Sequence, residues 1–169
     1  MHKTFFTADM HLCHANIIKH CNRPFQSVED MNRTLIDNWN LVVGENDTIY
    51  HLGDLFLGKR NDIDILEELN GHIHLILGSH DNSQWLRKTG LFDSMCNLKT
   101  IRIDGQKIVL CHYAMRVWES SHHGSWHLFG HSHGGLEPHG CSFDVGVDCS
   151  AFTPINYESV KTRMGNVNG

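Results

Sequence analysis

Hydrophobic and polar residues alternate along the chain in two distinct periods. From Val28 to Val42, apolar side chains recur at 3-4-4-3 spacing, which predicts an amphipathic helix. Ser27 stands where an N-cap is expected and Asp30 occupies the capping-box position, so the helix should begin there. Short apolar runs predict strands at 3–7, 47–52, 72–77, 100–103, 107–112, 126–129 and 142–147.

The order of these elements indicates an α/β domain. Further helices are expected near Asn61–Leu69, Ser83–Lys88 and Asn156–Met164, and the pair Asp104-Gly105 predicts a hairpin between two strands. Strands alternate with helices in the first half, whereas strands follow one another in the second half. We therefore expect one domain over residues 1–169, with mixed sheets flanked by helices. The irregular segment Tyr113–Ser125 is expected to form a loop over any site.

Short blocks of histidine and aspartate follow the apolar runs between residues 9 and 133. Side chains two residues apart on a strand share a face, so each Asp-x-His or His-x-His pair can approach one ion. Sites in such folds collect at the carboxyl ends of strands, where these blocks lie. The sequence therefore predicts one convergent metal site. The blocks are Asp9-Met10-His11, Gly53-Asp54, Gly78-Ser79-His80-Asp81, His112 and Gly130-His131-Ser132-His133.

The composition narrows the possible partners and location. A net charge of −5 and a pI near 6.3 give no reason to expect strong binding to a nucleic-acid polymer. The apolar stretch at the start is too short for a signal peptide, and no run approaches the length of a membrane span. We expect a cytoplasmic protein that acts away from membranes.

The order and spacing of the blocks resemble the calcineurin-like metallophosphoesterase superfamily. Its pattern is D-x-H, G-D, G-N-H-D/E, a lone His and then G-H-x-H, which matches residues 9–133 here. The resemblance implies a four-layer α/β/β/α sandwich of two mixed sheets flanked by helices, with a dinuclear site at one sheet edge. The size is similar to the small prokaryotic or phage branch, whose members often act on phosphodiesters or small phosphorylated compounds.

The resemblance also assigns roles to residues by position. It implies two divalent transition-metal ions, with Mn²⁺ first and Fe, Zn or Ni as alternatives. Hydrolysis would proceed by attack of a metal-bridging hydroxide, with His80 as general acid for the leaving group. One ion would be held by Asp9, His11, Asp54 and His133, and the other by a shared Asp54 with Ser79, His112 and His131.

The expected substrate is a small phosphorylated compound, with a nucleotide as one candidate and a phosphodiester favoured over a phosphomonoester. His14 and Arg23 are candidates to bind its phosphate, together with Ser79. For His14 and Arg23, a surface or packing role is the alternative.

Ser79 departs from the family pattern, which has asparagine there. An asparagine carbonyl can reach a metal while its NH₂ group donates to a phosphoryl oxygen, whereas serine is shorter and offers one hydroxyl. Three explanations remain open: variation with water filling the gap, a change that lowers activity, or a retuned substrate preference. The alternative function is therefore a catalytically weakened module that binds metal and phosphate. A structural zinc protein is less favoured, because closed zinc sites use Cys and His.

Overall fold

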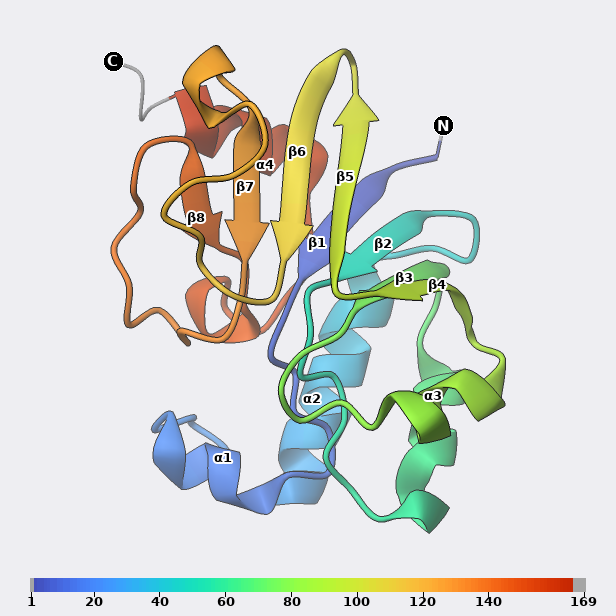
Figure 1. The fold of residues 1–169 in the computed structure, drawn as a ribbon. Coiled ribbons are helices and arrows are strands. Elements are labelled where there is room, and N and C mark those ends of the chain that lie inside the picture. Colours follow the sequence, from blue (N-terminus) through green and yellow to red (C-terminus); the bar gives the residue numbers. More distant parts are fainter. Residues whose placement is uncertain (1, 166–169) are drawn as a thin grey trace.

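Two mixed sheets form the centre of the protein, which a computed structural model describes from residue 2 to residue 165 (Figure 1). The first sheet has the order β4-β3-β2-β1-β9; its first four strands are parallel, and β9 runs antiparallel to β1. The second has the order β5-β6-β7-β8, with only the β5–β6 pair antiparallel. The strands are β1 (Thr4–Thr7), β2 (Thr48–His51), β3 (His72–Ile76), β4 (Phe92–Cys96), β5 (Leu98–Ile103), β6 (Gln106–Cys111), β7 (Trp126–Phe129), β8 (Ser142–Asp144) and β9 (Ile155–Asn156).

The longest helix begins where its cap predicts. The Ser27 hydroxyl accepts a hydrogen bond from the Asp30 backbone N–H at 3.1 Å, so the predicted N-cap is confirmed. The helices are α1 (Ala15–His20), α2 (Val28–Val42), α3 (Ser83–Thr89) and α4 (Tyr157–Gly165), with 3₁₀ segments η1 (Arg60–Glu68), η2 (Ser121–His123) and η3 (Val147–Cys149).

Two hydrophobic cores follow from the alternation of side chains along the strands. Phe5 faces the core between the first sheet and α2, where it joins Leu35 and Trp39. Its neighbour Phe6 points the other way, into the core between the two sheets, to which α4 adds Val160. The expected α/β fold with two mixed sheets flanked by helices is confirmed (Figure 1). No helix among residues 2–165 is long and apolar enough to cross a membrane.

The structure confirms one local expectation, changes another and adds elements that were not predicted. The Asp104-Gly105 hairpin is confirmed, with φ values of 50° and 82° that suit a tight two-residue turn. The segment expected as a helix at 61–69 is 3₁₀ rather than α. No pattern in the sequence predicted α1, β4 or β9. α1 is too short for a helical period and buries only Ile17.

Contrary to expectation, the loop Tyr113–Ser125 does not cover the site. Trp118 donates its indole N–H to the Ser125 carbonyl at 3.1 Å, and its ring lies 5.4 Å from the His127 ring. His127 alternates with Leu128, which faces the core between the sheets, so the loop packs on the opposite face of the second sheet. Tyr113 at the start of the loop reaches the His/Asp blocks, with its ring beside His131.

Candidate metal centre

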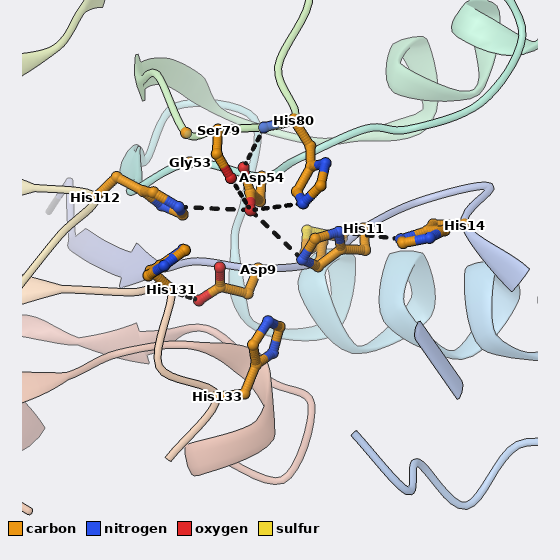
Figure 2. A network of polar contacts seen from close by, with 12 residues as sticks. Asp9, His11, His14, Gly53, Asp54, Ser79, His80, His112, His131 and His133 are labelled. Atoms are coloured by element: carbon orange, nitrogen blue, oxygen red, sulfur yellow. Dashed lines mark hydrogen bonds and ion pairs between the residues drawn. The ribbon is translucent and has the colours of Figure 1, made fainter. Parts of the chain in front are cut away.

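The five His/Asp blocks meet where the carboxyl ends of parallel strands from both sheets come together (Figure 2). Backbone hydrogen bonds join the blocks within each sheet. The Asp9 N–H donates to the Gly53 carbonyl at 2.9 Å, and the Gly130 N–H donates to the His112 carbonyl at 3.0 Å. Residues far apart in the sequence thus form one cluster because their strands are neighbours.

The backbone of this cluster is held in an unusual conformation. Non-glycine residues rarely adopt the left-handed region, and such strain concentrates at functional sites. The close approach also requires glycine. A Cβ at Gly53 would lie 2.5 Å from His112 Nδ1, and one at Gly130 would lie 2.6 Å from Asp9 Oδ2. Five block residues have φ between 47° and 66°: Asp9, His11, Asp54, His131 and His133.

Asp9, His11 and His133 form a first group of ligand-type atoms. One such atom from each lies within 4.8 Å of the others, and the His11 and His133 rings stack with centroids 5.3 Å apart. Asp9 Oδ2 accepts the His131 backbone N–H at 2.8 Å, whereas the buried Oδ1 has no hydrogen-bond partner. The group is therefore preorganised around a point that a cation can occupy.

Asp54, His112 and His131 form a second group within the same 4.8 Å limit. His112 Nδ1 bonds the Leu52 carbonyl at 2.7 Å, so its Nε2 faces Asp54 Oδ2 at 3.4 Å. The same Asp54 oxygen lies 3.7 Å from His11 Nε2 (Figure 2). Asp54 thus stands between the two groups.

Burial sets the electrostatics of these side chains. It raises the pKa of Asp9 to about 7 and lowers the pKa of His11 to about 3. Burial also acts to raise the pKa of Asp54, but the His112 imidazole and the His80 backbone N–H hold it well below its usual range. A cation between these groups would stabilise both the buried carboxylates and the neutral imidazoles.

Unpartnered atoms support the fit of a metal to this cluster. Among residues 2–165, five buried side-chain nitrogen or oxygen atoms lack a hydrogen-bond partner. Three of them belong here, namely Asp9 Oδ1, His11 Nε2 and His112 Nε2. A mixed imidazole and carboxylate set of this kind suits a divalent transition metal. The cluster can therefore hold metal.

A cavity of about 440 Å³ opens in front of the cluster. His80 lines it with a half-exposed ring whose Nε2 lies 4.0 Å from Asp54 Oδ2. Further lining comes from His14 and from the unpredicted α1, which contributes Asn16, Ile17 and His20. His14 Nδ1 lies 3.4 Å from His11 Nδ1. His14 and His80 thus both face the space where a ligand would lie (Figure 2).

The block around Ser79 is held by a carboxylate that sequence reasoning did not assign. Asp81 accepts backbone N–H groups from Gly78 at 2.8 Å and from Asp54 and Leu55 at 2.9 Å. It therefore fixes the loops and does not orient His80. Ser79 is exposed, and its hydroxyl donates to Asp54 Oδ2 at 3.3 Å.

Arg23 does not face the cavity, so its expected contact with substrate phosphate is wrong. Its side chain is 0% exposed. Nε and Nη2 both donate to the Asp148 carboxylate at 2.8 Å, and Nη1 and Nη2 donate to the carbonyls of Met10 and Asp9 at 3.0 Å and 2.6 Å. These bonds, with a contact from Nη1 to Met31 Sδ, use the donors of the guanidinium inside the protein.

Fold and site together define an α/β protein of two mixed sheets with a buried His/Asp cluster able to hold divalent metal. The chain is 36% identical over 170 residues to the uncharacterized protein MJ1445 of Methanocaldococcus jannaschii. The matched region covers 95% of this chain and 90% of MJ1445. It belongs to the same family as MJ1445.

Two further similarities extend this result. A stretch of 85 residues, 48% of this chain and 41% of the other, is 34% identical to the gene 66 protein of Mycobacterium phage L5. The solved structure of the protein of unknown function AQ665 from Aquifex aeolicus has a TM-score of 0.78 at 22% identity. The match covers 96% of this chain and 100% of the AQ665 chain, so the two proteins have the same fold. No protein-family profile matches the sequence.

Proposed function

We propose that the protein is a metal-dependent phosphoesterase that uses two divalent transition-metal ions. The observation that carries the proposal is the place of Asp54 between two groups of ligand-type atoms at the wall of an open cavity. Two neighbouring cations require a shared anionic ligand to offset their repulsion, and Asp54 is the carboxylate in that place.

The ligand sets follow from the two groups. Ions bound there would lower the pKa of a coordinated water and offset the charge of a phosphoryl group. Mn²⁺ is the proposed metal, with Fe, Zn or Ni as alternatives. The first ion would be held by Asp9, His11, His133 and Asp54, and the second by Asp54, His112, His131 and the hydroxyl of Ser79.

The remaining cavity residues act on the substrate in this proposal. His80 protonates the departing oxygen, because its half-exposed ring faces the cavity beside Asp54. His14, whose ring centroid lies 6.1 Å from that of His80, donates to a phosphoryl oxygen. The volume of about 440 Å³ favours a small substrate, for which we propose a phosphodiester before a phosphomonoester.

The direct test compares bis(p-nitrophenyl) phosphate with p-nitrophenyl phosphate in the presence of Mn²⁺. We expect faster hydrolysis of the diester, loss of turnover after chelation, and recovery when Mn²⁺ is added back. The metal content is measured on the same samples. Two bound ions without turnover of either substrate would contradict the esterase and favour a module that only binds metal and phosphate.

Ser79 is the feature that favours this second candidate, and Ser79→Asn tests it. The asparagine carbonyl reaches farther than the serine hydroxyl, so we expect the second ion to bind roughly tenfold tighter, with higher turnover at limiting Mn²⁺. Titration calorimetry and initial rates measure both effects. Ser79→Ala is the matched control, since it removes the hydroxyl that contacts Asp54 and should not improve binding. An asparagine variant with unchanged affinity and rate would show that Ser79 is no weakness.

A further inference from the structure

A carboxylate outside the five blocks contacts one of the ligand candidates. Asp148 lies in η3, and its side chain is 9% exposed. Its Oδ2 is 2.7 Å from His133 Nδ1. The carboxylate also receives two hydrogen bonds from Arg23, one to each oxygen. Asp148 therefore joins a buried cation to the imidazole of the first metal group.

Arg23 also connects Asp148 to the backbone at Asp9, which belongs to the same metal group as His133. Its Nη2 donates both to Asp148 and to the carbonyl of Asp9, and Nη1 donates to the carbonyl of Met10. One guanidinium thus fixes the backbone that carries Asp9 and the carboxylate that contacts His133. Its charge also compensates Asp148.

This contact determines which ring nitrogen of His133 is available. An ionised carboxylate only accepts hydrogen bonds, so Nδ1 must carry the proton that lies between His133 and Asp148. In the neutral ring, the lone pair is then on Nε2, the nitrogen that remains for the group with Asp9 and His11. A carboxylate behind a histidine ligand also raises its basicity toward a metal. In His112, by contrast, Nδ1 contacts the neutral carbonyl of Leu52 and not a carboxylate.

Asp148 could itself be a metal ligand, because Cys21, His133 and Asp148 also bring ligand-type atoms within 4.8 Å of one another. The contacts argue against this role. Both oxygens of Asp148 accept hydrogen bonds from Arg23, so a cation there would lie against the guanidinium. Burial also raises the pKa of the Cys21 thiol, which disfavours the thiolate that binds metal.

We propose that Asp148 is a positioning residue of the first metal site, where it holds His133 with Nε2 toward the ion and has Arg23 as its counter-ion. This inference rests on the proposed function, because it takes His133 as a ligand. Nothing in the Asp-x-His pattern identifies Asp148, which follows the last block by fifteen residues.

The test is Asp148→Asn, which keeps the size of the side chain and removes its charge. We expect Mn²⁺ affinity at the first site to fall by about 10–100-fold, measured by titration calorimetry. The second readout is ¹⁵N NMR of the His133 ring in metal-free protein at alkaline pH. The wild type should show the single Nδ1–H tautomer, and the variant a mixture. Asp148→Glu, which restores the carboxylate, should recover part of the affinity and of the tautomer preference.

Asp144→Asn is the matched control. Asp144 is buried in the same region and accepts from Ser132, Gly134 and Gly146 without contacting the His133 ring. Its loss should lower thermal stability but leave the His133 tautomer in place. The role of Asp148 is overturned if the wild type binds Mn²⁺ and Asp148→Asn changes only the melting temperature. A wild-type protein that binds no divalent ion overturns the proposed function, and the role of Asp148 with it.

Discussion

Replacing Asp54 by asparagine is expected to abolish the pairing of the two metal ions and to lower turnover by at least about 10²–10³-fold. Asp54 Oδ2 lies 3.4 Å from His112 Nε2 and 3.7 Å from His11 Nε2, so one carboxylate serves both groups. A neutral amide in that place cannot offset the repulsion of two cations. Elemental analysis should find at most one ion per chain, and initial rates with bis(p-nitrophenyl) phosphate measure the loss.

The control for this variant is Asp37→Asn in α2. Asp37 is 62% exposed and pairs only with the exposed Arg33 among the contacts described for it, so metal content and rate should not change. In Asp54→Asn, the amide oxygen of the new side chain can still accept the His80 backbone N–H, which favours a folded variant. An Asp54→Asn protein that keeps two ions and full turnover would refute the shared-carboxylate site.

Replacing His80 by glutamine should lower the rate without removing metal, because the ring of His80 belongs to neither ligand group. General acid catalysis contributes about 10²–10⁴-fold, and it matters most when the leaving group is a poor one. We therefore expect a large fall for a nucleoside phosphodiester with an alkoxide leaving group. The fall should be small for bis(p-nitrophenyl) phosphate, since p-nitrophenolate leaves without a proton.

His14→Gln is the matched comparison for His80, since both side chains line the same cavity. A group that only binds phosphate should raise KM to a similar degree for both leaving groups. If His80→Gln also affects the two substrates equally, His80 is a binding residue and not the general acid.

The fold shows which elements local sequence can specify. The helix at Val28–Val42 was predictable because its apolar spacing and the Ser27 cap are both local features. α1 and β4 were not predictable in the same way. α1 has a single buried residue, Ile17, and β4 pairs with β3 across a register shift that only the neighbouring strand determines.

The site also has features that the local sequence specifies and features that depend on contacts between distant residues. The residue types and their positions after strands were enough to predict that Asp9 and Asp54 would converge, because parallel strands end at a common edge. The sequence could not distinguish Arg23 as a phosphate ligand from Arg23 as a buried counter-ion. That distinction depends on which atoms lie within hydrogen-bonding distance of the guanidinium.

By itself, then, the sequence determined the chemistry of the cluster: imidazoles and carboxylates at strand ends, with serine at position 79. These features depend on residue type and on the two-residue period of a strand, which are readable locally. The tertiary structure alone decided the supporting contacts, including α1 as the cavity wall and the Arg23–Asp148 pair, whose members are 125 residues apart. Such contacts depend on how separate elements pack, and hydrogen bonds between distant polar groups leave no periodic pattern in the chain.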